Sequence, residues 1–218
     1  MTEQAPPETE FHLVRHGETE WNAAGRVQGQ AESRLSARGL AQAAALGTQL
    51  DIAHYDAVYC SSSVRTRQTL DGVLAGRPCK PVFRDALREI HLGPWQRKLR
   101  TEVTRVWPRA FDHFLNAPER FALEGAETVA ELQHRGCSAL STIAAAQPGQ
   151  RVLVISHGAL IKAVYCVAAG LPLSALWSGP QAQNCARFVV VQRPDGALRF
   201  VAHHPGGDAL CDGEVTSS

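Results

Sequence analysis

Apolar residues along the chain fall into short β-rich runs that alternate with longer segments of helical periodicity. The runs that predict strands cover residues 11–14, 57–59, 151–155, 186–191 and 198–202, with a weaker candidate at 81–83. Helical periodicity covers residues 37–50, 64–74, 100–115, 128–146 and 159–169. Pro148-Gly149 and Gly170-Leu171-Pro172 are typical helix stops, so the last two helices are predicted to end there.

The alternation of strands and helices ends in a hairpin signal, two β-rich runs joined by the turn Arg193-Pro194-Asp195-Gly196. Parallel strands with crossover helices form sheets that are covered on both faces. We therefore predict an α/β fold, a three-layer α/β/α sandwich with a mostly parallel central sheet and an antiparallel edge. No segment resembles an interdomain linker, so residues 1–218 are predicted to form a single domain with flexible tails at 1–9 and 206–218.

The charge balance of the 218-residue chain argues against a polyanionic partner. Its formal net charge is +1, which gives no global field to attract nucleic acid or an acidic membrane. The longest apolar runs, such as residues 152–155, are far shorter than a membrane span requires. We expect neither nucleic acid nor membrane as a partner, and any anion must be bound by a local cluster of basic side chains.

Cysteine usage and the N-terminal composition both indicate a reducing compartment. The six cysteines, none of them in a Cys-x-x-Cys pair, are Cys60, Cys79, Cys137, Cys166, Cys185 and Cys211. This scatter favours reduced cysteines that act as small hydrophobes over a disulfide framework or a structural zinc site. Residues 1–10 are acidic and contain prolines, without the basic start and apolar block of a secretory signal. A cytoplasmic location is the resulting expectation.

Two predicted strands are each followed by a histidine and a glycine. The first continues into Arg15-His16-Gly17, and the strand at 151–155 continues into Ser156-His157-Gly158. In open α/β sheets, ligands bind beyond the carboxyl ends of the strands. The helix that begins after Gly158 offers exposed N–H groups to an anion. One histidine at a strand end is ordinarily a polar surface residue, but two of them, one beside an arginine, favour an anion site.

The segment after the strand at 57–59 adds basic side chains to this edge. Ser61-Ser62-Ser63 provides natural N-caps, and Arg65 and Arg67 follow in the first helical turn, where a cation is unfavourable unless an anion lies nearby. Residues two apart do not share a helix face, so we expect only one of the two arginines to face the crevice. Glu89 is of interest because the other elements lack a proton donor for a leaving group.

Several motifs occur together in a fixed order along the chain. They are Leu13-Val14-Arg15-His16-Gly17-Glu18-Thr19-Glu20-Trp21-Asn22, Gly25-Arg26-Val27-Gln28-Gly29, Leu35-Ser36-Ala37-Arg38-Gly39-Leu40-Ala41-Gln42-Ala43, Ser61…Arg65…Thr69, Leu87…Glu89…Gly93…Trp95, Gly125-Ala126-Glu127-Thr128 and Ser156-His157-Gly158. In this order they resemble the histidine phosphatase superfamily, which includes cofactor-dependent phosphoglycerate mutases and many small phosphatases. The resemblance spans the chain from Phe11 to about Val191.

The resemblance implies a phosphoglycerate mutase-like fold and a role for each matching residue. His16 would be the nucleophile that becomes phosphorylated, and Glu89 the general acid and then the base. The residues that would line the phosphate site are Arg15, His16, Asn22, Gln28, Gly29, Arg65, Glu89, His157 and Gly158. A protonated His157 would add a third positive group beside the two arginines. No metal or other cofactor is expected.

Phosphoryl transfer constrains the protonation of two of these groups. His16 must be neutral at its attacking nitrogen, so its other ring N–H is expected to bond a backbone carbonyl that fixes the tautomer. A phosphate dianion next to Glu89 favours the protonated carboxyl, which can then supply the leaving oxygen with its proton.

Three functions fit this site. We favour a phosphatase that hydrolyses a small phosphorylated metabolite, because the segment between Glu89 and Gly125 is shorter than in the phosphoglycerate mutases. The alternatives are mutase-type phosphoryl transfer and a non-catalytic phospho-ligand binding protein, against which the intact set of catalytic residues argues. The sequence leaves the oligomeric state open, a homodimer being one outcome.

Two departures from the family pattern affect the choice of substrate. Many relatives have proline where this chain has Arg34, and many have glycine where it has Arg97, which Lys98 and Arg100 follow. This basic trio is either a solvated helix start, the interpretation we favour, or a recognition site for a second anionic group.

Overall fold

The computed structural model describes residues 7–207, which contain a six-stranded sheet in the order β3-β2-β4-β1-β5-β6. The strands are β1 (Thr9–Arg15), β2 (Ala57–Ser61), β3 (Val82–Arg84), β4 (Arg151–Ser156), β5 (Arg187–Gln192) and β6 (Leu198–His204). Strands β3, β2, β4 and β1 are mutually parallel, whereas β5 runs antiparallel to β1 and β6 antiparallel to β5. The mostly parallel sheet, its antiparallel edge and the closing hairpin are thereby confirmed.

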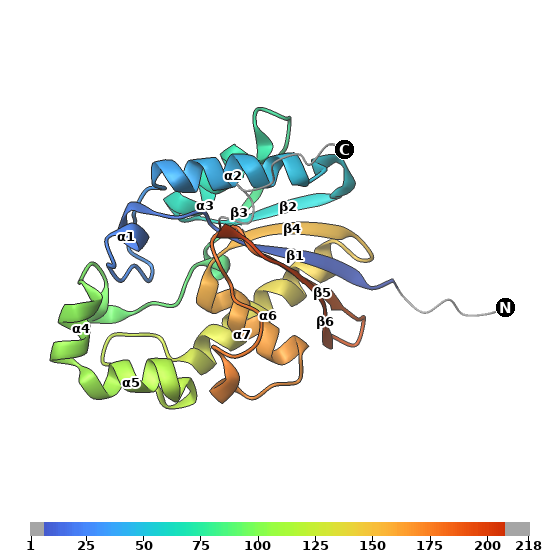
Figure 1. Cartoon of the computed structure of the whole chain (residues 1–218). Helices are drawn as coiled ribbons and strands as arrows, with labels where there is room; N and C mark the ends of the chain where they lie inside the picture. The colour runs from blue at the N-terminus through green and yellow to red at the C-terminus, as the bar shows by residue number, and fades with distance from the viewer. Residues whose placement is uncertain (1–6, 208–218) are drawn as a thin grey trace, which may run out of the picture.

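Helices cover both faces of this sheet (Figure 1). They are α1 (Glu20–Ala23), α2 (Ala37–Gln49), α3 (Val64–Leu74), α4 (Arg100–Val106), α5 (Pro108–Asn116), α6 (Val129–Ala146) and α7 (Gly158–Ala168). Helices α2 and α3 lie on one face and α6 and α7 on the other, while α4 and α5 extend beside α1 (Figure 1). The predicted three-layer α/β/α sandwich is confirmed.

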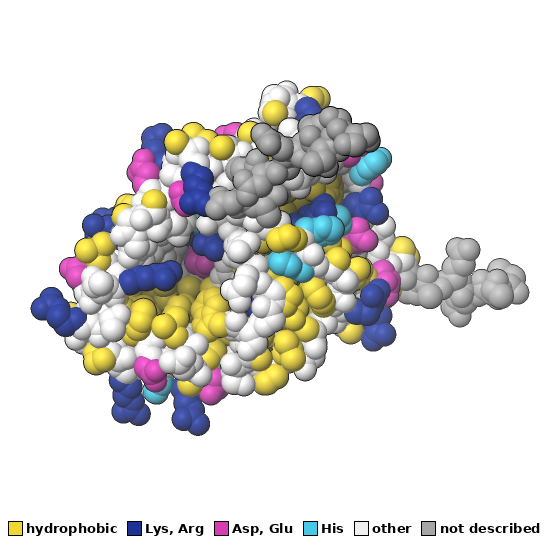
Figure 2. All heavy atoms as spheres, viewed as in Figure 1, with side chains coloured by type: hydrophobic (Ala, Val, Ile, Leu, Met, Phe, Trp, Pro, Cys, Tyr) yellow, Lys and Arg dark blue, Asp and Glu magenta, His cyan; other side chains and the backbone are white. Residues whose placement is uncertain are grey.

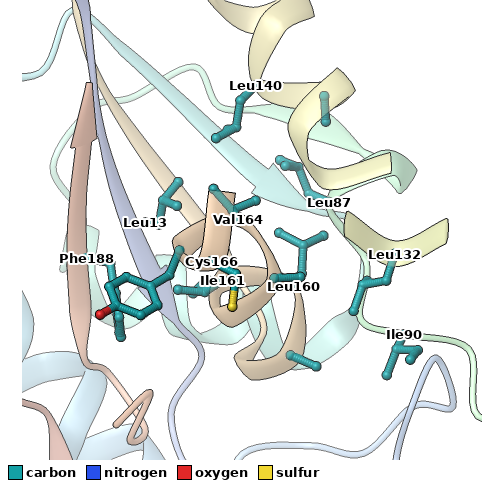
Figure 3. Packing of buried hydrophobic residues seen from close by; sticks show 14 of the residues in the cluster. Leu13, Leu87, Ile90, Leu132, Leu140, Leu160, Ile161, Val164, Cys166 and Phe188 are labelled. Atoms are coloured by element: carbon teal, nitrogen blue, oxygen red, sulfur yellow. The ribbon is translucent and has the colours of Figure 1, made fainter. Parts of the chain in front are cut away.

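Strand β4 shows why the sheet needs a layer on each face. Val152 and Val154 belong to the apolar cluster on the side of α6 and α7, whereas Leu153 and Ile155 belong to the cluster on the side of α2 and α3. All four side chains are fully buried, as expected of a central parallel strand. In Figure 3 the α7 side chains point toward those of the sheet and of α6, which fills this layer of the core.

Two sequence predictions about helices and tails were wrong. The predicted helix at 100–115 is two helices, because Pro108 disfavours helical geometry in the preceding residue and Trp107 has φ −128° and ψ 56°. The predicted tail at 1–9 includes Thr9, which is 2% exposed, lies in β1 and donates to the carbonyl of Gln147 at 3.0 Å.

The C-terminal tail predicted at 206–218 also begins too early. Gly206 is buried, and the N–H of Gly207 donates to the carbonyl of Asn184 at 2.7 Å. The rest of this segment, residues 208–218, and residues 1–6 of the N-terminal one lie outside the described residues.

Other sequence expectations concern cysteines and membranes. Cys60, Cys79, Cys137 and Cys166 form no disulfide within residues 7–207, and Cys211 lies outside that range. No helix of the described part is long and apolar enough to cross a membrane.

The loop after β1 is held by a close approach of two backbones. A Cβ on Gly17 would lie 2.5 Å from the carbonyl oxygen of Gly39, and a Cβ on Gly39 would overlap the carbonyl of Glu18. Glycine is required at both positions because α2 packs directly on the backbone that follows His16. The first turn of α2 therefore fixes the path of the chain just after the strand end that carries the histidine.

We expect Gly39→Ala to lower the free energy of unfolding by about 3 kcal/mol, because the added methyl group meets backbone that cannot move aside. Urea denaturation measures this. Gly136→Ala in α6 is the matched control, since there the added Cβ meets only the side chains of Val164 and Leu160, at 3.1 and 3.3 Å. Equal destabilisation by the two substitutions would contradict the account of the loop.

Candidate active site

Strand pairing brings the two motif histidines together. Strands β1 and β4 are neighbours with Arg15 opposite Ser156, and the N–H of His16 donates to the Ser156 carbonyl at 3.0 Å. The rings of His16 and His157 consequently meet edge to face, with centroids 5.3 Å apart. Both side chains are buried at the carboxyl ends of their strands. Both histidines thus reach the same edge of the sheet, as the sequence predicts, but only His16 lines the pocket there.

His16 is held in one tautomer. Its Nδ1 lies 2.7 Å from the carbonyl oxygen of Gly17, and because a carbonyl can only accept, the proton resides on Nδ1. The side chain is 3% exposed, and burial, followed by the charges of Arg65 and Arg15, holds the pKa of His16 well below 6.5. Nε2 thus carries a lone pair at neutral pH, as the chemistry of a nucleophile requires.

His157 differs from its sequence prediction. Its Nδ1 accepts a hydrogen bond from Nε of Arg65 at 3.2 Å, and its Nε2 lies 2.8 Å from Oγ of Ser61. An N–H can be accepted only by an unprotonated nitrogen, so this ring is neutral, and burial holds the pKa of His157 well below 6.5. The third positive charge that the resemblance implied is therefore absent from this phosphate-free structure, and His157 is not among the residues that line the pocket.

Arg65 is the arginine of α3 that faces the crevice. It is 1% exposed, and its terminal nitrogens donate to the carbonyls of Ala31 and Gly29 at 2.9 and 2.7 Å. Burial lowers the pKa of Arg65 to about 10, which leaves the guanidinium charged at neutral pH. Arg67 lies on the exposed side, over the ring of Phe83 at 4.3 Å. The prediction that only one of the two arginines points inward is confirmed.

Arg15 lies at the other side of the same pocket. Its NH1 donates to the carbonyl of Ala182 at 2.7 Å, while its buried Nε has no hydrogen-bond partner within residues 7–207. A Cβ on Gly158 would approach this Nε to 3.4 Å, so the glycine leaves room beside the guanidinium. A buried donor without a partner is costly, and an anion in the pocket would satisfy it.

Glu89 reaches the pocket from the segment that follows β3. Its carboxylate accepts three backbone N–H groups, from Ile90 at 3.0 Å, Ala159 at 3.1 Å and Leu160 at 3.2 Å. The last two belong to the first turn of α7, where the helix dipole favours negative charge. Sequence reasoning predicted an anion at this helix end, and the side chain of Glu89 occupies it.

The remaining predicted residues line the same pocket, which has a volume of about 350 Å³. Asn22 uses its amide oxygen to accept the N–H of Thr19, and Gln28 has a buried Oε1 without a partner among the described residues. Gly29 has φ +54°, and a Cβ there would lie 2.5 Å from Oε1 of Gln96. Apart from His157, every predicted site residue therefore lines one pocket.

The three basic residues Arg97, Lys98 and Arg100 differ in their position relative to the pocket. Arg100 lines the pocket, whereas Arg97 and Lys98 do not. Arg97 is exposed with φ +73°, and its carbonyl accepts from the guanidinium of Arg26. Arg97 and Arg100 are both exposed, as the solvated interpretation predicts, and Arg100, the first residue of α4, lines the pocket as well.

Sequence reasoning missed Arg135 of α6, which holds the segment that carries Glu89. Its guanidinium donates to three backbone carbonyls of this segment, those of Ala86, Arg88 and Glu89. Glu127 pairs with it at 2.8 Å and also accepts the N–H of His91. The available signal was a charged residue three positions after buried Leu132 on an otherwise apolar helix face.

An aromatic wall at one end of the pocket was also missed. It comprises Trp95, Phe111, Phe114 and Trp177, which come from three distant segments. Figure 2 shows hydrophobic side chains gathered beside basic ones where α4 and α5 lie. Within residues 7–207 no group of three or more His, Cys, Asp or Glu side chains is arranged to hold a metal ion. The arrangement combines a cationic end, suited to a phosphate, with an apolar end.

Comparison with known proteins places this geometry in a family. A family model for the histidine phosphatase superfamily (branch 1) matches residues 11–203, almost the whole described chain. The chain belongs to the histidine phosphatase superfamily. The match covers the whole span from Phe11 to about Val191 over which the resemblance extends, and the phosphoglycerate mutase-like fold that it implied is confirmed.

Histidine phosphatases from several organisms are similar to this chain. Phosphoserine phosphatase 1 of Hydrogenobacter thermophilus is 34% identical over 166 residues, which cover 76% of this chain and 79% of the relative. The metal-independent phosphoserine phosphatase of Arabidopsis thaliana is 38% identical over 160 residues, or 72% and 67% of the two chains. The solved structure of Bacillus stearothermophilus YhfR superposes with a TM-score of 0.84 at 34% identity, covering 89% and 96%. The chain is an enzyme of this superfamily, a phosphatase.

We expect the imidazoles of His16 and His157 to stay neutral in the phosphate-free enzyme as the pH drops through 6.5, because burial and nearby arginines hold both pKa values well below 6.5. NMR of ¹³C-labelled histidine measures this, and His16→Gln removes one of the two signals. The unfolded chain takes up these protons below pH 6.5 and the folded chain does not. The free energy of unfolding therefore falls as the pH drops below about 6.5. Titration of both rings near pH 6.5 would contradict the assigned tautomers.

Proposed function

We propose that this histidine phosphatase hydrolyses a small phosphomonoester through a phosphohistidine intermediate on His16. The observation that carries the proposal is the unprotonated Nε2 of His16, fixed by the Nδ1–H bond to Gly17 and flanked by buried Arg65 and by Arg15, whose Nε is buried. Phosphoryl transfer depends mainly on alignment and on neutralising the phosphoryl oxygens. A neutral, oriented nucleophile among fixed cations supplies both.

In the first step, Nε2 of His16 attacks phosphorus in line with the bond to the alcohol oxygen. The N–P bond forms as the P–O bond breaks, and the electron pair leaves on the alcohol oxygen, which takes a proton from Glu89. Arg15 and Arg65 hold the phosphoryl oxygens through guanidinium N–H groups that the protein carbonyls do not use. Asn22, Gln28, Gly29 and Gly158 form the pocket around this group.

In the second step, water attacks the phosphohistidine and gives its proton to the carboxylate of Glu89. The N–P bond breaks, its electron pair returns to Nε2, and phosphate leaves with the enzyme restored. Arg135 supports this role, since it fixes the backbone of Glu89 and its neighbours. His157 orients Arg65 by accepting its Nε–H.

The names of the two phosphoserine phosphatases support hydrolysis of a small phosphorylated metabolite. A binding protein without activity is less consistent with an intact nucleophile, two arginines and a carboxylate in one pocket. Oligomeric state and location in the cell stay predictions.

We expect His16→Ala to lower kcat/KM for p-nitrophenyl phosphate at least about 1,000-fold, because the covalent route loses its nucleophile. Spectrophotometric assay of p-nitrophenol release measures this. The matched control is His54→Ala, a substitution of an exposed histidine outside the pocket, which keeps wild-type activity. Near wild-type activity of His16→Ala would rule out the covalent mechanism.

For Glu89→Gln we expect a larger loss of kcat/KM with an alkyl phosphate than with p-nitrophenyl phosphate. An alkoxide is a poor leaving group that needs a proton, whereas p-nitrophenolate leaves without one. Parallel assays of released phosphate compare ethyl phosphate with p-nitrophenyl phosphate for this variant and the wild type. If the two substrates lose equal factors, Glu89 is not the general acid.

A further inference from the structure

The pocket has an end that phosphate binding does not use. The phosphate end is formed by Arg15, His16, Arg65 and Glu89, and the opposite end by six apolar side chains. These are Leu92, Trp95, Phe111, Phe114, Leu115 and Trp177. Both ends belong to one cavity, so a substrate whose phosphoryl group reaches His16 places its alcohol part toward these six.

The apolar end is held in place by its own contacts. The ring of Trp95 packs against those of Phe111 and Phe114, with centroids 5.9 and 5.8 Å apart, and Phe114 packs against Trp177 at 5.3 Å. Nε1 of Trp177 donates to the carbonyl of Phe114 at 2.6 Å, which ties this segment to α5. Such tilted and edge-to-face packing stabilises a preformed wall, and preformed apolar pockets are the usual binding sites of small organic ligands.

The segment that carries Trp177 is fixed by a second contact, from α7. Lys162 is buried, and its Nζ donates to the carbonyls of Ser178 and Pro180 at 2.5 and 3.0 Å. Lys162 thus donates its hydrogen bonds to backbone carbonyls. These bonds hold the segment that carries Trp177 against α7.

The charges that line the pocket argue against a cationic alcohol part. Within the described residues, Glu89 is the only acidic residue of the lining, and its carboxylate already accepts three backbone N–H groups. Arg26 and Arg100 line the pocket as well and would repel an ammonium group. An α-amino group would consequently be desolvated there without a counter-charge.

We propose that the alcohol part of the substrate is an uncharged, apolar, ring-bearing group that packs against Trp95, Phe111, Phe114 and Trp177. This inference rests on the proposed function, and it names the class of phosphomonoester that the site prefers. An apolar ring gains the free energy of burial at the wall, whereas a zwitterionic alcohol such as serine gains none of it.

The hydrolytic test compares substrates with similar alkoxide leaving groups, so that the chemical step is matched. They are ethyl phosphate and 2-phenylethyl phosphate, with O-phospho-L-serine as the zwitterionic case. Burial of a phenyl ring predicts a kcat/KM about 10- to 100-fold higher for 2-phenylethyl phosphate than for ethyl phosphate. O-phospho-L-serine is expected to fall below 2-phenylethyl phosphate. A ratio near one between the ethyl and phenylethyl substrates would overturn the proposal.

Variants of the aromatic wall test whether its side chains cause the preference for the phenylethyl substrate. Phe114→Ala is expected to lower the phenylethyl-to-ethyl ratio of kcat/KM at least about 5-fold, and Phe111→Ala serves as a second variant if the first does not fold. Val106→Ala is the matched control, because Val106 is an exposed apolar residue of neighbouring α4 outside this pocket. A ratio unchanged in both folded phenylalanine variants would overturn the proposal.

A binding measurement separates this proposal from the proposed function. Isothermal titration calorimetry compares 2-phenylethylphosphonate with ethylphosphonate, whose P–C bonds the enzyme cannot hydrolyse. We expect about 10-fold or tighter binding of the phenylethyl compound. That preference in a protein without phosphatase activity would contradict the proposed function and support the apolar subsite. Equal affinities in an active enzyme would contradict the subsite alone.

Discussion

Burial of two like charges against one small pocket is the constraint on which the site depends. The guanidinium group of Arg65 and Nε of Arg15 are removed from water, and charge without a counter-charge is expensive to bury. Backbone carbonyls of the loop at 29–31 and of Ala182 accept some of their N–H groups, and Glu89 supplies partial compensation. The two histidines stay neutral because they are buried, and the charges of the two arginines act in the same direction. A phosphate dianion provides the negative charge that this arrangement lacks. The burial that lowers the stability of the protein therefore favours binding of the phosphate group and its attack by His16.

The fold meets this constraint by using backbone wherever it can. Parallel pairing of β1 and β4 sets the two histidines side by side. The carbonyl of Gly17 then fixes His16, and the carbonyl of Gly29 together with the ring of His157 fixes Arg65. The N-terminus of α7 holds the carboxylate of Glu89 at the pocket. Neutral hydrogen-bonding groups thereby orient charged ones, which keeps the electrostatic field of the pocket directed at a ligand.

Periodicity and motif spacing were sufficient for the layers, the strand ends and the residues attached to them. Arg65 could be separated from Arg67 because helix geometry decides which of two nearby residues faces inward. Contacts between distant segments had no local signal: the hydrogen bond that makes Arg65 a partner of His157 depends on how α3 packs against β4. The aromatic wall was missed for the same reason, and the charge of Arg135 on an apolar helix face did not identify its partners, which lie tens of residues away. At Pro108 a local signal was present, but apolar periodicity outweighed it.

The central claim is that the phosphoryl group passes through Nε2 of His16. Its most direct test is to mix the enzyme with p-nitrophenyl phosphate, quench in alkali on the millisecond timescale, and map the phosphorylated peptide by mass spectrometry. The account predicts a phosphoryl group on the peptide that contains His16, stable to base, lost in acid and located on Nε2. Turnover with no phosphoryl group on His16, or with one on a different residue, would contradict it.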